Sequence, residues 1–236
     1  FAVRSGPGHH HLPRTLATND WQHKTADPKN SSRRRSGGKP RSGSRRPRTR
    51  TFAPMSSPTP ISLEATPVDS APIAFASLNL DHRLLEGTRD LGYKETRPIQ
   101  SAVISLALAG EDLIGCAETG TGKTCAFVVP TLQMLLTTPP RHAVVDGAAS
   151  GPRSRVLVLA PTRELAVQIE DEIHGLAYHT NITSAAVYGG VEMGMQERAL
   201  KAGVDIIVAT PGRLMDHMRQ QNANLSGVEL LILDEA

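Results

Sequence analysis

The second half of the chain alternates between short apolar runs and longer segments with helical periodicity. The apolar runs are continuous rather than alternating with polar residues, which is typical of parallel strands buried on both faces. Strands are predicted at residues 113–116, 155–160, 184–188, 205–209 and 230–233, and helices at 123–136, 163–174, 193–202 and 213–219. Strands that alternate with helices predict an α/β fold, with a mostly parallel sheet and helices on both of its faces.

Two more helices are predicted before this alternation begins. Leucines recur mostly at helical spacing within residues 75–93, at Leu78, Leu80, Leu84, Leu85 and Leu91. A second helix is expected to begin near Pro98 and to end near Gly110. Residues 137–153 are rich in Pro and Gly and predict a loop. The folded domain is therefore expected to cover residues 73–236.

Residues 1–72 show no hydrophobic period and are rich in Arg, Ser, Pro, Gly and Thr, which predicts a disordered basic extension. Residues 1–60 contain 13 Lys/Arg and 2 Asp/Glu, a net charge of +11, whereas residues 61–236 contain 13 and 21, a net charge of −8. Three interpretations stay open. The extension is an electrostatic arm for phosphate backbones, a solvated linker, or, for residues 1–54, sequence upstream of a true start at Met55 that the cell never translates.

Cysteine usage and hydropathy exclude several classes of protein. Cys116 and Cys125 are too few for a disulfide framework and too far apart for a C-x-x-C metal or redox pair. No apolar stretch approaches the length of a membrane span without polar interruption. We therefore expect a cytoplasmic protein with no disulfide partner and no membrane segment.

A glycine-rich turn follows the strand predicted at residues 113–116 and precedes an apolar helix. It consists of Ala117, Glu118, Thr119, Gly120, Thr121, Gly122, Lys123 and Thr124. This fits the phosphate-loop pattern, with Ala117 in the place of the first glycine. The glycines let backbone N–H groups converge on phosphate, Lys123 can reach the β- and γ-phosphates, and Thr124 can ligate Mg²⁺. The alternative is a chance glycine-rich turn, which the flanking strand and helix disfavour.

Two adjacent acids, Asp234 and Glu235, follow the last predicted strand. A phosphate loop needs a carboxylate on a neighbouring strand to hold Mg²⁺, and Asp234 meets that need. Glu235 is placed to polarise an attacking water as a general base. The predicted catalytic residues are therefore Lys123, Asp234 and Glu235, with Thr124 and Asp234 as metal ligands. The alternative is a strand end with two solvated acids.

Together these segments resemble the N-terminal RecA-like domain of DEAD-box RNA helicases, over residues 75–236. The matching segments follow the order of the family. The Q motif resembles Phe75, Gly92-Tyr93 and Pro98-Ile99-Gln100, motif I resembles residues 117–124, and motif Ia resembles Pro161-Thr162-Arg163-Glu164-Leu165-Ala166. The next two motifs resemble Gly189-Gly190 and Thr210-Pro211-Gly212-Arg213. The first three letters of D-E-A-D correspond to Asp234-Glu235-Ala236.

The resemblance implies an adenine site in the Q motif. In the family the glutamine amide reads the adenine edge and the upstream aromatic residue stacks on the ring, which assigns these tasks to Gln100 and Phe75. Phe75 and Tyr93 can equally be core residues. Arg97 stands where the family usually has threonine, and it either adds a contact to the nucleotide or lies in solvent.

The resemblance also implies an RNA-binding face that contacts the backbone of one strand without reading its sequence. The residues expected there are Pro161, Thr162, Arg163, Gly189, Gly190, Thr210, Pro211, Gly212 and Arg213. Arginine cations, a threonine hydroxyl and glycine N–H groups suit phosphate and ribose rather than base edges. Residues 161–166 taken alone can also be a helix start with Thr162 as its N-cap.

The expected function is that of an ATP-dependent RNA helicase, which couples hydrolysis of ATP with Mg²⁺ to local unwinding of an RNA duplex. The chain is expected to continue after Ala236 with an aspartate and a second RecA-like domain that supplies arginines for the γ-phosphate. Without that domain we expect weak nucleotide binding and no unwinding. The alternatives are a non-catalytic, ATP-regulated RNA-binding module, and a DNA helicase or another P-loop ATPase.

Overall fold

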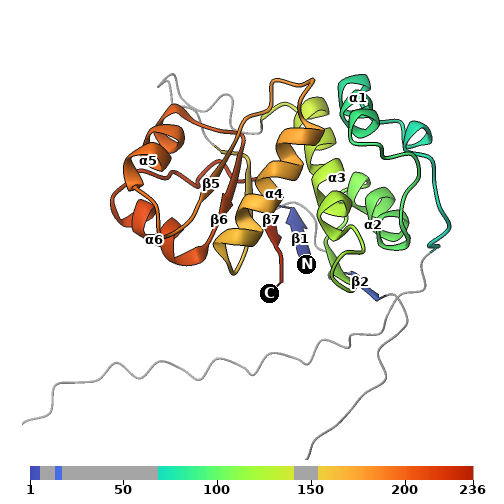
Figure 1. Cartoon of the computed structure of the whole chain (residues 1–236), viewed down its shortest axis with the longest axis horizontal. Coiled ribbons are helices and arrows are strands. Elements are labelled where there is room, and N and C mark those ends of the chain that lie inside the picture. Colours follow the sequence, from blue (N-terminus) through green and yellow to red (C-terminus); the bar gives the residue numbers. More distant parts are fainter. Residues whose placement is uncertain (6–13, 18–68, 141–153, 236) are drawn as a thin grey trace, which may run out of the picture. The chain divides into compact units, whose positions relative to one another are not determined.

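A seven-stranded sheet forms the centre of the domain, with its strands in the order β2-β3-β1-β7-β4-β6-β5 (Figure 1). The computed structural model describes residues 1–5, 14–17, 69–140 and 154–235. The strands are β1 Ala2–Ser5, β2 Arg14–Ala17, β3 Leu113–Cys116, β4 Val156–Leu159, β5 Ser184–Val187, β6 Ile206–Ala209 and β7 Leu230–Leu233. All five predicted strands are present, with ends that differ from the prediction by at most one residue.

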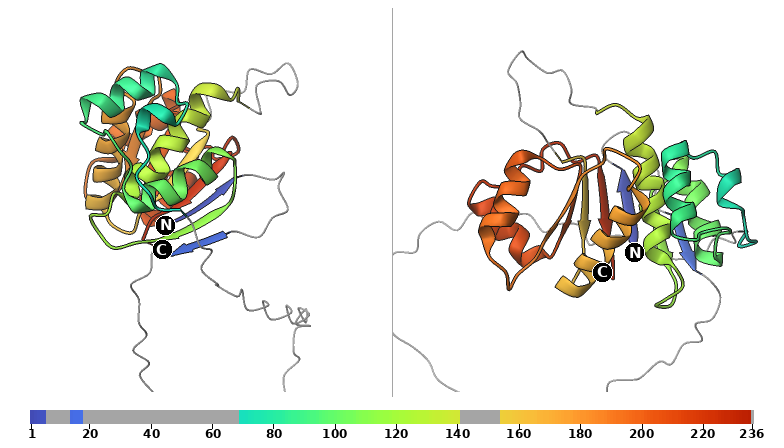
Figure 2. Two further views of the ribbon diagram at one scale, coloured as in Figure 1. Left: turned by 90° about the vertical axis from the view of Figure 1, so that its right-hand side faces the viewer. Right: turned by 45° about the horizontal axis from the view of Figure 1, so that its top comes forward.

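Helices cover both faces of this sheet. They are η1 Phe75–Ser77, α1 His82–Asp90, α2 Pro98–Leu108, α3 Lys123–Thr137, α4 Arg163–Leu176, α5 Met193–Ala202 and α6 Pro211–Arg219. Along β4, Val156 and Val158 pack into the cluster that includes α3 and α4, whereas Leu157 packs with Leu200 of α5 and Leu214 of α6. Because successive residues of a strand face opposite sides, both faces are apolar and both are covered. Figure 2 shows these layers from two further directions.

The prediction that residues 1–72 lack regular structure is wrong for β1 and β2. β1 lies between β3 and β7 and runs antiparallel to both, whereas the other strands pair in parallel. Val3 is 8% exposed, and the Phe1 ring lies 5.3 Å from the Phe127 ring. Without β1, the facing edges of β3 and β7 would leave backbone groups unpaired in the middle of the sheet, which is costly. Residues 6–13 and 18–68 of the predicted extension lie outside the described residues.

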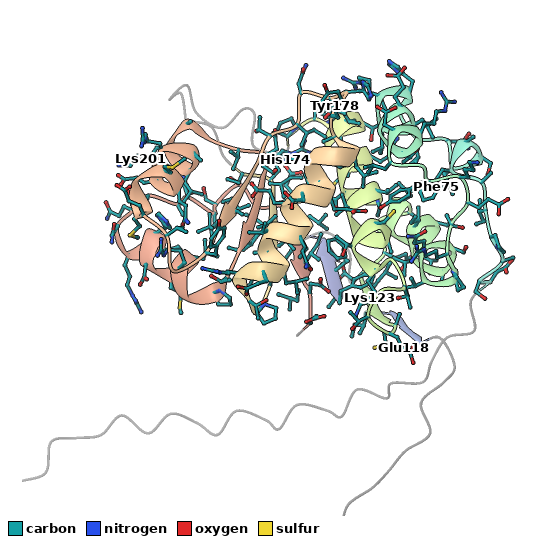
Figure 3. The ribbon with its side chains drawn as sticks, viewed as in Figure 1. Phe75, Glu118, Lys123, His174, Tyr178 and Lys201 are labelled. Carbon is teal, nitrogen blue, oxygen red and sulfur yellow. The ribbon has the colours of Figure 1, made fainter. Side chains whose placement is uncertain are left out.

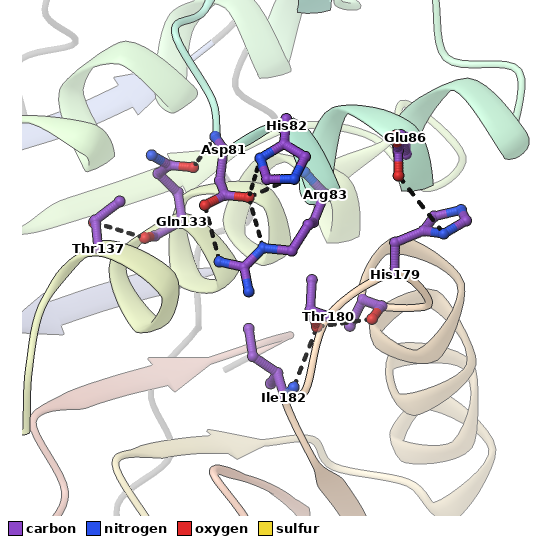
Figure 4. Close-up of polar contacts among 10 residues, drawn as sticks. Asp81, His82, Arg83, Glu86, Gln133, Thr137, His179, Thr180 and Ile182 are labelled. Atoms are coloured by element: carbon purple, nitrogen blue, oxygen red, sulfur yellow. Dashed lines mark hydrogen bonds and ion pairs between the residues drawn. The ribbon is translucent and has the colours of Figure 1, made fainter.

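Polar contacts join α1 to α3 and to the segment that follows α4 (Figure 4). Asp81 caps α1 by accepting from the Arg83 N–H, and its backbone N–H donates to Oε1 of Gln133 on α3 at 2.8 Å. The Arg83 guanidinium holds the pKa of Asp81 down at about 2, because it hydrogen bonds to the carboxylate. Among the described residues, no helix is both long enough and apolar enough to cross a membrane.

Candidate nucleotide and nucleic-acid site

The loops that carry the candidate residues all leave the sheet at one edge. β4, β5, β6 and β7 run parallel, and Leu159 is in register with both Leu233 and Ala209, which in turn pairs with Val187. β3 points the same way, because β1 is antiparallel to both β3 and β7. Ligands of open α/β sheets bind at this carboxyl edge. The segments after these strands are residues 117–122, 160–162, 188–192, 210 and 234–235.

The phosphate loop joins β3 to the N-terminus of α3. Gly120 and Gly122 adopt positive φ angles of 82° and 87°, a backbone conformation that disfavours residues with a Cβ. Gly122 is the N-cap of α3, so the unpaired N–H groups of that helix face the loop. Lys123 is the first residue of the helix, and Figure 3 shows it with Glu118 at this end of α3. The loop therefore has the geometry of an anion site at a helix start.

Gln100 and Arg97 of the Q motif contact the phosphate loop directly. The Gln100 side chain is 5% exposed; its Nε2 donates to the Gly122 carbonyl at 3.1 Å, and its Oε1 accepts from the Arg97 N–H at 2.8 Å. Nη1 of Arg97 donates to the Gly120 carbonyl at 2.7 Å. Arg97 is therefore exposed but tied to the phosphate loop, and its contact with a nucleotide stays a prediction. In this structure both the oxygen and the nitrogen of the Gln100 amide form hydrogen bonds within the protein, so Gln100 also helps to position the loop.

A cavity of about 540 Å³ lies between these segments, a size typical of small-molecule sites. It is lined by the Q-motif residues Phe75, Tyr93, Arg97 and Gln100, by Thr119, Gly120, Gly122, Lys123 and Thr124, by Asp234 and Glu235, and by Leu165, Gln168 and Glu172 of α4. The structure thus brings most of the predicted adenine, phosphate and acidic residues together around one cavity, whereas Ala117, Glu118 and Thr121 are not part of its lining. The α4 residues of the lining were not predicted for this site. Leu165 belongs to motif Ia, which was assigned to the RNA-binding face, and no motif identifies Gln168 and Glu172.

The two aromatic residues of the Q motif lie side by side. Phe75 is 2% exposed and belongs to the main core cluster, and its ring is stacked on the Tyr93 ring with centroids 5.9 Å apart. The Tyr93 hydroxyl donates to Oε1 of Glu172 on α4 at 2.6 Å. Burial and this carboxylate raise the pKa of Tyr93, so its hydroxyl stays protonated. Both rings serve the core and also line the cavity.

The two acids after β7 differ in exposure. Asp234 is 4% exposed, and burial raises the pKa of its carboxyl group, although the amino group of Phe1 and Lys123 oppose this. Glu235 is exposed, has a positive φ of 52°, and its N–H donates to Oδ1 of Asp234 at 3.1 Å. The last residue of the predicted motif, Ala236, lies outside the described residues.

The donor set of the cavity fits Mg²⁺. The described residues contain no cluster of three or more His, Cys, Asp or Glu side chains that could enclose a metal by themselves. Mg²⁺ does not need such a cage, because it is usually bound by one or two carboxylates together with water and phosphate oxygens. Asp234 and Thr124, which both line the cavity, supply a buried carboxylate and a hydroxyl.

A second group of segments meets further along the same edge. A Cβ added at Gly190 would lie 3.4 Å from Nη1 of Arg163, so the arginine at the start of α4 lies against the glycine pair. Nη1 of Arg213 donates to the Val191 carbonyl at 3.1 Å, and the Thr210 N–H donates to the Val187 carbonyl at 2.9 Å. The predicted RNA-binding residues Pro161, Thr162, Arg163, Gly189, Gly190, Pro211 and Gly212 are exposed, and Thr210 and Arg213 are partly exposed. The structure therefore brings the predicted residues of three loops together.

Thr162 also has the structural role that the sequence allowed. It is the N-cap of α4, and its Oγ1 accepts from the Leu165 N–H at 3.3 Å. This fixes the end of α4 whose free N–H groups face the exposed edge, so a helix start and an anion-binding position coincide.

Comparison with known proteins identifies the family. The family model for the DEAD/DEAH box helicase matches residues 97–236. The chain is 45% identical over 165 residues, 70% of its length, to the human "Probable ATP-dependent RNA helicase DDX27", and 47% identical over 163 residues, 69% of its length, to "DEAD-box ATP-dependent RNA helicase 28" of Arabidopsis thaliana. It is also 40% identical over 162 residues to "ATP-dependent RNA helicase CshA" of Listeria monocytogenes, of which it covers 29%. The chain spans 20% of the length of the human and Arabidopsis relatives. On its fold, its motifs and these matches, the chain belongs to the DEAD/DEAH box helicase family.

Proposed function

We propose that this chain is the ATP-binding part of a DEAD-box RNA helicase, which binds ATP with Mg²⁺ and the backbone of single-stranded RNA. The observation that carries the proposal is the convergence at one sheet edge of a phosphate loop, a buried acid, and a row of exposed arginine and glycine residues. A nucleotide cavity and a backbone-binding surface on the same rigid domain are what coupling of hydrolysis to RNA remodelling requires.

The nucleotide roles follow from positions around the cavity. Gln100, with Phe75 and Tyr93 beside it, takes the adenine end, and Lys123 with the α3 N–H groups takes the phosphates. Thr124 and Asp234 hold Mg²⁺, which when bound neutralises charge on the phosphate oxygens.

Glu235 is proposed as the base that polarises the attacking water. It is exposed at the cavity, whereas Asp234 beside it is buried, so only Glu235 is open to solvent water. A general base must reach its proton within hydrogen-bonding distance, directly or through one water. The left-handed backbone at Glu235 turns this residue out of the strand direction, which fits a functional position.

The RNA edge is proposed to bind phosphate and ribose without reading bases. Arg163 and Arg213 offer guanidinium groups, and Gly189, Gly190 and Gly212 let a backbone approach closely because they carry no side chain. Groups of these kinds contact the nucleic-acid backbone, which carries no sequence information of its own.

Unwinding is proposed for a longer protein, because the chain spans about a fifth of the length of its human and Arabidopsis relatives. We include in the proposal a second RecA-like domain of the same polypeptide, which would complete the catalytic site. A cytoplasmic, reducing setting is also part of the proposal and fits the unpaired thiols of Cys116 and Cys125.

Two variants test the nucleotide assignment. Lys123→Ala should lose binding of fluorescent ATP and ADP, because the phosphates lose their main cation. Glu235→Gln should retain this binding, since the glutamate acts on water and not on the nucleotide. In the protein with both domains, Glu235→Gln should abolish ATP turnover. Retained turnover would remove Glu235 from the role of base.

Two further measurements separate the proposal from its rivals. RNA should stimulate ATP turnover of the two-domain protein, whereas DNA of the same sequence should not; equal stimulation would indicate a DNA helicase or another P-loop ATPase. Complete absence of turnover despite tight binding of ATP and RNA would indicate a non-catalytic RNA-binding module.

A further inference from the structure

Gln196, on α5, is a buried polar residue outside every motif identified from the sequence. It is 7% exposed and is bonded to Tyr188, directly before the glycine pair, and to Arg213. Buried amide groups are costly unless they are hydrogen bonded, so the partners of such a residue indicate what it is for. Its partners belong to the loop after β5 and to α6, which carry residues of the proposed RNA edge.

The Gln196 amide contacts three places at once. Nε2 donates to the Tyr188 carbonyl at 3.0 Å, directly before the glycine pair. Oε1 lies 3.4 Å from Nη1 of Arg213 and 3.3 Å from Nε2 of His217, which are both on α6. One side chain therefore links the loop after β5 to the first two turns of α6.

These contacts also fix the hydrogen positions of the network. Because Nε2 of Gln196 donates to a carbonyl, the oxygen is the end of the amide that faces Arg213 and His217. An arginine can only donate, so Oε1 accepts from it and must also accept from His217. His217 therefore carries its proton on Nε2, which leaves Nδ1 as a buried acceptor without a partner in this structure. Burial and the nearby Arg213 lower the pKa of His217, which favours the neutral imidazole.

We infer that Gln196 is a positioning residue for RNA binding, which holds the glycine pair and Arg213 in the arrangement that accepts an RNA backbone. This inference rests on the proposed function. Gln196 is buried and does not itself touch the ligand. Gln196 acts on RNA binding in two ways. It holds the Tyr188 carbonyl, which shares a peptide plane with the Gly189 N–H and so sets the direction of that donor. It also holds the guanidinium of Arg213.

Arg213 shows why such positioning matters. Its Nη1 donates to Val191 and to Gln196, while a guanidinium has five N–H donors in a rigid plane. The two hydrogen bonds of Nη1 fix the orientation of the guanidinium plane, and with it the direction of the N–H groups on Nη2 and Nε. A long side chain that is ordered before binding loses less conformational freedom when the RNA backbone arrives.

The test compares two substitutions at Gln196 with a matched control. Gln196→Met keeps the length of the side chain and removes all three contacts. Gln196→Glu keeps an acceptor for Arg213 and His217 but cannot donate to the Tyr188 carbonyl. The control is Gln220→Met at the end of α6, where the glutamine is exposed. Each variant of the full chain is measured for affinity to a fluorescent single-stranded oligouridylate, affinity to fluorescent ADP, melting temperature and hydrogen–deuterium exchange.

Gln196→Met should weaken RNA binding roughly tenfold, the equivalent of about one good hydrogen bond. Exchange should rise at residues 188–192 and 210–213, while ADP affinity stays at the value of the Gln220→Met control. The melting temperature should fall below that of the control, because the partners of the amide lose their hydrogen bonds. Gln196→Glu should raise exchange at residues 188–192 alone and should weaken RNA binding less than Gln196→Met does.

RNA affinity equal to that of the control, with unchanged exchange, would overturn the positioning role. So would equal losses of RNA affinity and ADP affinity, which would mark Gln196 as a general stability residue. Arg163→Ala separates this question from the proposed function: if it weakens RNA binding, the RNA edge stands whatever Gln196 shows. If the wild-type chain binds no RNA, the RNA edge fails, and the exchange data alone decide whether Gln196 positions the two loops.

Discussion

At the scale of single residues, the phosphate loop shows two glycines with the same backbone conformation and different surroundings. A Cβ on Gly122 would lie 2.4 Å from Nε2 of Gln100 and 3.3 Å from Cδ of Arg97. A Cβ on Gly120 would meet nothing within 4 Å. Gly120 is therefore needed for its positive φ alone, whereas Gly122 also makes room for the Q-motif glutamine.

This difference predicts unequal costs for two alanine substitutions. Gly120→Ala should lower the free energy of unfolding by about 1 kcal/mol, the cost of a side chain at positive φ. Gly122→Ala should cost about 2 kcal/mol more, because it also displaces the buried Gln100 amide from its hydrogen bonds. Urea denaturation of both variants measures the difference, and equal costs would show that Gln100 moves aside freely.

His217 predicts a dependence of stability on pH. Burial and the nearby Arg213 lower the pKa of its imidazole, while Glu197 and Asp216 oppose this shift. The unfolded chain takes up a proton at this histidine below about pH 6.5, whereas the folded chain does not until a lower pH. The unfolded state then binds more protons, so the free energy of unfolding falls as the pH drops through this range.

His217→Gln retains a donor for Gln196 and removes the titrating group. The variant should therefore lose less stability than the wild-type chain between pH 7 and pH 5, as followed by melting temperature. The other histidines remain in both proteins, so the difference between the two curves belongs to His217. Parallel curves would contradict a lowered pKa for this group.

At the scale of elements, α4 links the two candidate sites. Its first residue, Arg163, lies against Gly190 at the nucleic-acid edge, and Glu172, further along the helix, lines the nucleotide cavity. Its middle is fixed in the core by Ile169, which is fully buried. A continuous helix that is held at three points moves as one body. A displacement of α4 at Glu172 would therefore also change the position of Arg163.

The hydrogen bond between Tyr93 and Glu172 connects α4 to the Q motif. It can be removed by deleting one atom, the hydroxyl oxygen of Tyr93. Tyr93→Phe should lower the free energy of unfolding by about 1–2 kcal/mol, because a part-buried carboxylate loses its donor. Tyr178→Phe is the matched control, since Tyr178 is 77% exposed (Figure 3), and it should change stability little. Equal effects of the two substitutions would show that the bond contributes nothing measurable.

A buried ion pair joins the starts of β4 and β7, at the edge of the sheet opposite the site. Nη2 of Arg155 donates to Oε2 of Glu229 at 2.9 Å, and both side chains are under 9% exposed. Arg155→Met should lower the free energy of unfolding by about 3 kcal/mol, because the carboxylate of Glu229 loses its arginine partner inside the protein. The double variant Arg155→Met/Glu229→Met should lose less than the single one in chemical denaturation. A double variant less stable than Arg155→Met would show that Arg155 is not the main partner of Glu229.

At the scale of the whole molecule, the sequence predicts the parallel layers and the motif loops well. β3, β7 and α5 have the bounds that the apolar runs and their flanking breakers indicate, because these signals are local. The motif loops could be placed at one edge of the sheet, since parallel strands end at the same side.

The strands and hydrogen bonds that depend on partners far away in the sequence were not predicted. β1 is short and lies in a polar region. Only the gap between β3 and β7 lets Val3 become buried and Phe1 pack against the core. The bond from Tyr93 to Glu172 spans 79 positions in sequence, and that from Gln196 to Arg213 spans 17. Polar pairs of this kind leave no periodic signal, because their energy depends on geometry that only the folded chain supplies.

The position of β1 has a consequence for the order of folding. Ala2 pairs with Leu233 and with Ile114, so β1 can take its place only after two strands far away in the sequence have come together. Closing a loop of this length costs entropy before any contact repays it. The helices and the strands β4, β5 and β6, which pair with one another, can form earlier from nearby segments. The middle of the sheet is thus completed in a late step, so its rate depends on loop closure more than on helix formation.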